Sequence, residues 1–86
     1  MRVLVIVRPD ASTRFGGDTV LARENFAALK DIGVDADFVE TDRPEPRGYD
    51  IAHIFNVGQP DVCKRQMDAC YAADVPVALS PVWLDL

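Results

Sequence analysis

Runs and stripes of apolar residues along the chain predict four strands and two helices. Residues 2–7 end in a continuous Val-Leu-Val-Ile-Val run, which is the pattern of a strand covered on both faces within a parallel sheet. Residues 34–40 alternate between apolar and acidic side chains, which is typical of a half-exposed edge strand. Two more apolar runs, at residues 50–55 and 75–79, predict the remaining strands.

The first helix is predicted between the first and second strands. Asp18 or Thr19 can cap its first turn, the periodic pattern continues to Ile32, and Gly33 is a natural stop just past that end. Its predicted apolar stripe consists of Ala22, Phe26, Leu29 and Ile32.

The second helix is predicted over residues 60–73, with a proline at its first position. Its apolar face carries Cys63, Met67 and Cys70. A rise of about 10 Å along the helix separates the two cysteines, which is too far for a disulfide. We therefore interpret both as buried thiols in a reducing compartment, in preference to metal or redox sites.

The order strand, helix, strand, strand, helix, strand predicts an open parallel sheet with right-handed crossovers. The connection over residues 40–50 is too short to contain a crossover helix, but it can cross the end of the sheet. The expected strand order is 2-1-3-4, with one helix on each face. We expect residues 1–86 to form a single, partial Rossmann-like α/β domain.

Length and charge narrow the functional classes. A chain of 86 residues has room for one domain with a thin core. Its net charge of −5 disfavours a nucleic-acid partner and an anionic membrane surface. The first apolar run stops at Arg8, too early for a secretory signal, and no stretch is long enough to span a membrane. These features predict a cytoplasmic protein, and no motif calls for a metal or a cofactor.

A ligand site is expected at the carboxyl ends of the strands. In open α/β sheets, ligands bind at that edge where the direction of strand addition reverses. Here the reversal falls between the first and third strands. The segments that converge on it are residues 8–18, 56–60 and 80–83.

A glycine pair, Gly16-Gly17, precedes the first helix. Glycines allow the backbone to approach a ligand closely, and free amides at a helix start attract anions. The pair can therefore form a binding site for a phosphate or a sugar. The following residue, Asp18, competes for the same amides. The pair matches neither the dinucleotide fingerprint nor a P-loop, so the residues alone favour the interpretation as a flexible connector with a tight turn.

Several polar residues lie near the expected site. Arg8 directly follows the first strand and is the better phosphate partner, whereas Arg14 is interpreted as a solvated loop charge. Asn56 ends the third strand and is either a ligand contact or a turn residue. His53 is favoured as a packed core residue over a catalytic one. Asn25 either ties the first helix to the preceding loop or lies at the edge of the stripe.

Three stretches resemble GT-B-type glycosyltransferases that use nucleotide-sugar donors. Residues 16–20, Gly-Gly-Asp-Thr-Val, look like the glycine-rich acceptor loop of that family. Residues 48–56, Gly-Tyr-Asp-Ile-Ala-His-Ile-Phe-Asn, are similar to one of its strands. Residues 75–83, Val-Pro-Val-Ala-Leu-Ser-Pro-Val-Trp, look like the strand that follows. The matches occur in the family's order and span nearly the whole chain.

The resemblance implies two Rossmann-like domains that face each other across a cleft. The N-terminal domain mostly holds the acceptor, and the C-terminal domain binds the nucleotide-sugar through a basic pair and an E-x7-E-type motif. Nothing in the 86 residues corresponds to the C-terminal domain, so the chain is expected to be inactive alone. Phe55 stands where many members have a histidine, which leaves the catalytic residue unassigned. The expected substrate-binding residues are Gly16, Gly17, Asp18, Arg8 and Asn56.

The apolar C-terminal segment indicates a missing partner. If the protein ended at Leu86 as a monomer, its apolar side chains would be exposed. Truncation of a larger domain is the favoured explanation, and self-association is the other. The residues expected to mediate self-association are Val82, Trp83, Leu84 and Leu86. The alternative function is accordingly a stand-alone flavodoxin-like binding domain or a homodimeric interaction module without catalysis.

Overall fold

The strands and helices follow one another in the order that the sequence pattern predicts. A computed structural model describes residues 1–9, 17–56 and 60–81, with the main chain alone for residues 17–19, 56, 80 and 81. The elements are β1 (Arg2–Val7), α1 (Gly17–Asp31), β2 (Asp35–Glu40), β3 (Ile51–Asn56), α2 (Pro60–Ala72) and β4 (Val77–Pro81). Neither described helix has the length and apolar character needed to cross a membrane.

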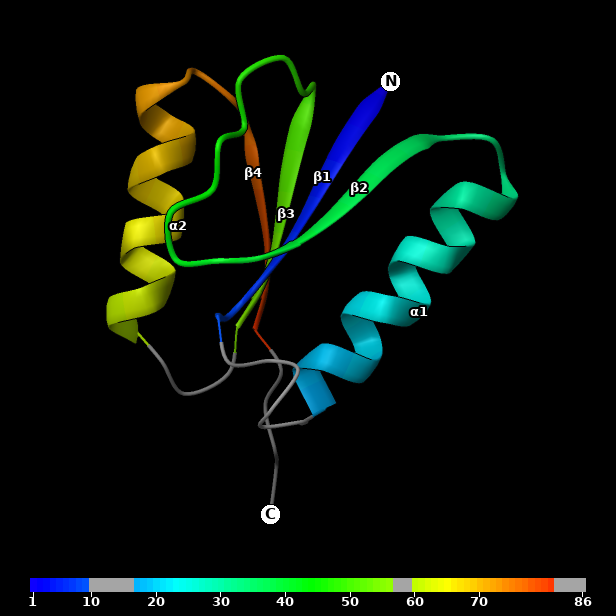
Figure 1. Cartoon of the computed structure of the whole chain (residues 1–86), viewed down its shortest axis with the longest axis horizontal. Coiled ribbons are helices and arrows are strands. Elements are labelled where there is room, and N and C mark those ends of the chain that lie inside the picture. Colours follow the sequence, from blue (N-terminus) through cyan, green and yellow to red (C-terminus); the bar gives the residue numbers. More distant parts are fainter. Residues whose placement is uncertain (10–16, 57–59, 82–86) are drawn as a thin grey trace.

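The strands form one parallel sheet in the order β2-β1-β3-β4, which confirms the predicted topology (Figure 1). In β1, Val5 lies opposite Phe38 of β2 and opposite His53 of β3. In turn, His53 lies opposite Ala78 of β4. All three strand pairs are parallel, so the four carboxyl ends point to the same edge of the sheet.

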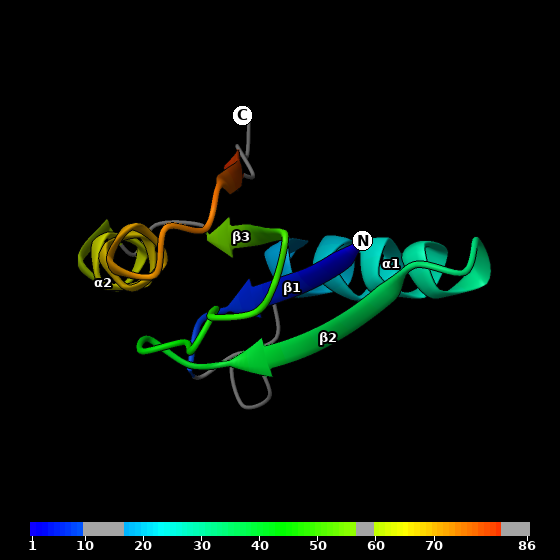
Figure 2. The ribbon, with the colours of Figure 1, turned by 90° about the horizontal axis from the view of Figure 1, so that it is seen from above.

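The two helices lie on opposite faces of the sheet, as expected (Figure 2). Alternate residues of β1 face each helix, because successive side chains of a strand point to opposite faces. On the α1 side, the buried residues are Val3, Val5, Val7, Ala22, Ala36 and Phe55. On the α2 side, they are Leu4, Ile6, Ala52, Ile54, Cys70 and Val75. The continuous apolar run of β1 therefore reflects burial on both faces.

The first helix begins at Gly17 and ends at Asp31. The prediction that Asp18 or Thr19 caps it is wrong, because both lie within its first turn, and the helix ends one residue before the predicted Ile32. Gly33 adopts a left-handed conformation with φ of 84°, and the amide of Val34 donates to the carbonyl of Leu29 at 2.9 Å. This bond pattern is a Schellman-type helix end. The prediction that Ile32 completes the apolar stripe is wrong: it is 76% exposed. Instead, the turn at Gly33 brings Val34 back against the core.

The last strand begins at Val77, two residues later than predicted. Asp74 has φ of 56°, and the amide of Val75 donates to the carbonyl of Cys70 at 3.0 Å. Val75 thus belongs to the turn that follows α2, and it is buried in the core. The carbonyl of Pro76 then accepts from the amide of Ala52 at 2.9 Å, which starts the β3–β4 ladder.

Candidate functional site

The carboxyl edge of the sheet brings together the described ends of the predicted segments. Val7 lies opposite Glu40, and Asn56 lies opposite Pro81, so β1, β2, β3 and β4 all end at this edge. Helix α1 starts at the same edge (Figure 1). The strand order reverses between β1 and β3, which is the location where open α/β sheets bind ligands.

The backbone of three predicted binding residues lies at this edge. Gly17 and Asp18 are the first two residues of α1, and Asn56 is the last residue of β3. A helix of 15 residues presents free amides and the positive end of its dipole at its start. Gly16 and Arg14 lie outside the described residues. So do the residues predicted to mediate self-association, Val82, Trp83, Leu84 and Leu86.

Arg8 is the residue directly after β1, and it is buried, with only 7% of its surface exposed. A guanidinium removed from water is stable only when other groups compensate its charge, and Arg8 does interact with another group. Arg8 therefore places a permanent positive charge beside the point where the strand order reverses. The choice of Arg8 over Arg14 as the candidate anion partner stays a prediction, because Arg14 lies outside the described residues.

Gln66 on α2 is a residue that sequence reasoning missed. Its side chain is fully buried, and Nε2 donates to the carbonyl of Val7 at 3.0 Å and to the carbonyl of Thr41 at 2.9 Å. The amide of Thr41 also donates to the carbonyl of Val7 at 3.1 Å. The Gln66 amide thus joins α2 to the ends of β1 and β2. One signal existed in the sequence: an amide side chain lies between Cys63 and Cys70 on the apolar stripe.

Two buried side-chain oxygens accept no hydrogen bond within the part of the chain that the structure describes. They are Oε1 of Gln66 and Oδ1 of Asn25. Buried polar atoms are usually paired, so these two oxygens are exceptions among the described residues. Whether Asn25 ties α1 to the preceding loop or lies at the edge of the stripe stays open, because residues 10–16 lie outside the described residues.

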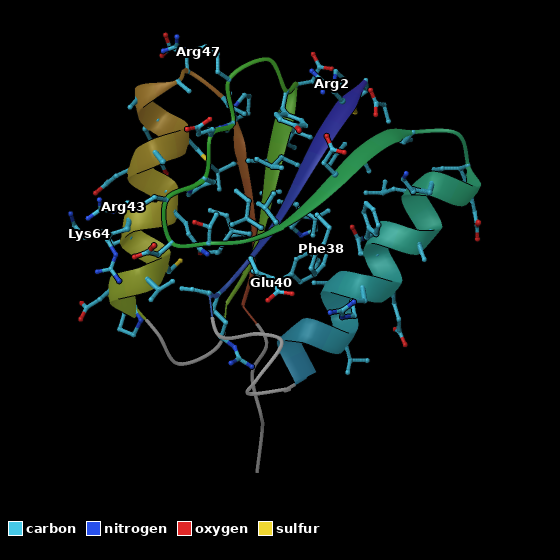
Figure 3. The ribbon with its side chains drawn as sticks, viewed as in Figure 1. Arg2, Phe38, Glu40, Arg43, Arg47 and Lys64 are labelled. Atoms are coloured by element: carbon cyan, nitrogen blue, oxygen red, sulfur yellow. The ribbon has the colours of Figure 1, made fainter. Side chains whose placement is uncertain are left out.

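Ion pairs on both faces lie close to the carboxyl edge. Nε of Arg65 is 2.9 Å from Asp42, which follows β2. On the α1 side, a guanidinium nitrogen of Arg23 is 3.8 Å from Glu40, and Figure 3 shows Glu40 beyond Phe38 toward this edge. Such partly exposed pairs contribute at most about 1 kcal/mol to stability.

His53 lies within β3, as the sequence predicts. It is half-buried, its ring stacks on that of Phe55 with a centroid separation of 4.2 Å, and burial lowers its pKa from 6.5. Because successive side chains alternate, His53 and Phe55 share the α1 face of the sheet with Ala78. This packing agrees with a structural rather than a catalytic histidine.

The pKa of His53 has a measurable consequence. The folded chain binds the imidazole proton less readily than the unfolded chain, whose histidine has a pKa of about 6.5. The contribution of His53 to stability is therefore complete above that pH and decreases as the pH falls toward the folded-state pKa. Urea unfolding between pH 7.5 and 5.5 should show a steeper loss of stability for the wild type than for His53→Gln. An NMR titration that placed the pKa of His53 above 6.5 would contradict the expectation.

The two cysteines are free thiols, as predicted. Burial raises the pKa of both Cys63 and Cys70, which keeps them protonated and unreactive. Sγ of Cys63 lies 3.8 Å from Sδ of Met67, within the apolar interface with the sheet. Among the described residues, no group of three or more His, Cys, Asp or Glu side chains could hold a metal ion.

A groove of about 410 Å³ lies away from the carboxyl edge, between the β2–β3 connection and the last turns of α2. It is lined by Glu45, Pro46, Arg47, Ala69, Ala72 and Ala73. Figure 3 shows Arg2 at the same end of the sheet as Arg47. Nε of Arg2 is 3.2 Å from Asp35, and its guanidinium lies 4.5 Å from the ring centre of Tyr49. These contacts consolidate the amino ends of the strands rather than the expected site.

The carboxyl edge therefore combines a helix start, a buried guanidinium and the ends of the two central strands. This set of groups is suited to binding an anion or a polyol, because it offers amide donors and positive charge. Comparisons with models of protein families, with curated proteins and with solved structures found no match to the chain.

Proposed function

We propose that the chain is the acceptor-side Rossmann-like domain of a GT-B-type glycosyltransferase that works in the cytoplasm. The reaction would transfer a sugar from a nucleotide-sugar donor to an acceptor hydroxyl. One observation supports this proposal above the others. Helix α1 opens at Gly17 of the glycine pair, at the same sheet edge as Arg8 and the end of β3.

Each binding residue has a distinct role in the proposal. Gly16 and Gly17 let the backbone approach the sugar and the donor diphosphate, since neither carries a side chain. Asp18 adds a carboxylate that accepts hydrogen bonds from acceptor hydroxyls. Arg8 contributes positive charge, and the Asn56 amide hydrogen-bonds the acceptor.

The chemistry also requires groups that these 86 residues do not supply. Negative charge develops on the leaving diphosphate, and it is stabilised by amides at the α1 start together with basic groups of a second domain. Closure of the second domain over the cleft excludes water, which prevents hydrolysis of the donor. The 86-residue chain alone is therefore expected to bind weakly and to transfer no sugar.

An NMR titration tests the site. Adding inorganic pyrophosphate to the ¹⁵N-labelled chain should shift the amide resonances of Gly17 and Asp18, with an affinity of about 1 mM or weaker because one helix start and one cation are few contacts. The variant Gly17→Val should reduce these shifts. A matched control, Arg47→Gln at the opposite end of the sheet, should leave them unchanged.

Two results would contradict the proposal. One is a set of shifts confined to the groove around Arg47 and Ala72. The other is micromolar binding of a nucleotide-sugar, which would show that the donor site is not missing. The coding sequence beyond Leu86 is a separate test, because the proposal requires a nucleotide-sugar-binding domain encoded there or in a neighbouring gene.

A further inference from the structure

The outer edge of β4 differs chemically from the outer edge of β2. Each is an edge of the described sheet, since β2 pairs with β1 and β4 pairs with β3. The β2 edge carries Asp35, Asp37 and Glu40, whereas residues 77–81 of β4 contain no charged side chain. Charged residues protect edge strands against pairing with other chains. Only the β4 edge lacks this protection among the described strands.

The main-chain groups of β4 that point outward follow from the ladder with β3. The amide of Ala52 donates to the carbonyl of Pro76, and Ala52 lies opposite Val77. In a parallel ladder, every second residue of a strand directs both its N–H and its C=O toward the same neighbour. The main-chain groups of Ala78 therefore point toward β3, and those of Val77 and Leu79 point outward. Pro81 is also an outward position, where its missing N–H removes no bond to β3. The outer edge therefore offers the N–H and C=O groups of Val77 and Leu79.

The side chains beside this edge are incompletely covered. Helix α1 packs against β1, β2 and β3, while α2 packs against β3. Figure 2 shows β4 at one end of the sheet, whereas the helices lie beside the middle of the sheet. Leu79 remains 45% exposed, and Val77 and Ala78 are only half-buried. An apolar partner at this edge would bury these side chains along with the main-chain groups.

We propose that a second copy of this chain pairs antiparallel with β4 across a two-fold axis that passes next to Ala78. Val77 of each chain then lies opposite Leu79 of the other, and each such pair exchanges both of its main-chain hydrogen bonds. The Val77 and Leu79 side chains of both copies meet on one face. The two four-stranded sheets become one continuous sheet. This inference is independent of the proposed function.

Charge favours a second copy related by a two-fold axis. Each chain carries a net charge of −5, so most approaches between two copies are repulsive. Pairing β4 with β4 brings together the two neutral edges and leaves the acidic β2 edges at the far ends of the joined sheet. Pairing β4 with β2 would place acidic side chains at the interface and would produce an open-ended filament. The self-complementary β4 pairing avoids both problems.

Sedimentation velocity on the 86-residue chain in 0.15 M salt, over micromolar to millimolar concentrations, tests this interface. We expect a dimer whose fraction rises with protein concentration. The substitution Leu79→Lys should raise the dissociation constant of this dimer at least about tenfold, because lysine opposes edge pairing. The matched control is Leu21→Lys, since Leu21 is also 45% exposed but belongs to α1 and not to an edge strand. The control should dimerise like the wild type.

Two results would overturn the inference: a monomer at every concentration, or a dimer that Leu21→Lys disrupts and Leu79→Lys does not. If β4 instead pairs with a strand of another protein, the isolated chain stays monomeric, which also overturns it. Amide hydrogen exchange of the wild type tests the β4 pairing even if Leu79→Lys fails to fold. Exchange at Val77 and Leu79 should slow as the protein concentration rises, and exchange independent of concentration would contradict the pairing.

Discussion

Replacing Ile54 by alanine is expected to lower the free energy of unfolding by about 2–5 kcal/mol. Ile54 is fully buried in the middle of β3, on the face that packs against α2. The substitution removes apolar contacts and leaves a cavity, since the strands on both sides of β3 restrict collapse. A small domain has a total stability of about 5–10 kcal/mol, so the variant should be partly unfolded at 37 °C.

Urea denaturation followed by circular dichroism measures this effect. The matched control is Ile32→Ala, because Ile32 is 76% exposed just beyond the end of α1. That substitution should change the free energy of unfolding by no more than about 0.5 kcal/mol. Equal effects of the two substitutions would mean that Ile54 is not in the core of the domain.

Replacing Gln66 by methionine should lower the free energy of unfolding by about 1–3 kcal/mol, although the two side chains have similar shapes. The change removes both hydrogen bonds from Nε2 and leaves the carbonyl of Thr41 without that donor. The carbonyl of Val7 keeps its bond from the Thr41 amide, which limits the loss. Because the volume is nearly conserved, the effect reports hydrogen bonding rather than a cavity.

Thermal and urea unfolding of Gln66→Met and a control on the same helix measure this contribution. The control Lys64→Met removes an exposed ion pair with Asp68, and it should cost no more than about 0.5 kcal/mol. A third variant, Gln66→Glu, places a carboxylate against two carbonyl oxygens, so it should be less stable than Gln66→Met at pH 7. Wild-type stability in Gln66→Met would show that these hydrogen bonds make no net contribution.

Much of the topology could be predicted from the sequence, because few arrangements satisfy its pattern. The apolar run of β1 requires cover on both faces, and two crossovers of one hand then put α1 and α2 on opposite faces. The acidic alternation in residues 35–40 places β2 at an edge. The expected location of the site follows from the strand order by a general rule that does not depend on the ligand, and it stays a prediction.

Details that depend on the conformation of single residues or on distant partners could not be predicted. The start of β4 is displaced because Asp74 adopts a left-handed conformation that usually belongs to glycine. The role of Gln66 depends on carbonyls 59 and 25 residues away in the sequence. Periodicity indicates which face of a helix is buried, but it does not indicate which buried amide finds a partner.

The central position of β1 determines how this chain can fold as it leaves the ribosome. Of the described elements, β1 is synthesised before the others, yet its two neighbours in the sheet are β2 and β3, which emerge only after α1 has been made. Until then the most apolar strand of the protein has no native neighbour. Parallel pairing also requires loop closure before any contact forms, so it is slow compared with hairpin formation. Nascent chains of this protein therefore expose an aggregation-prone segment early in translation, when protection by a chaperone is most useful.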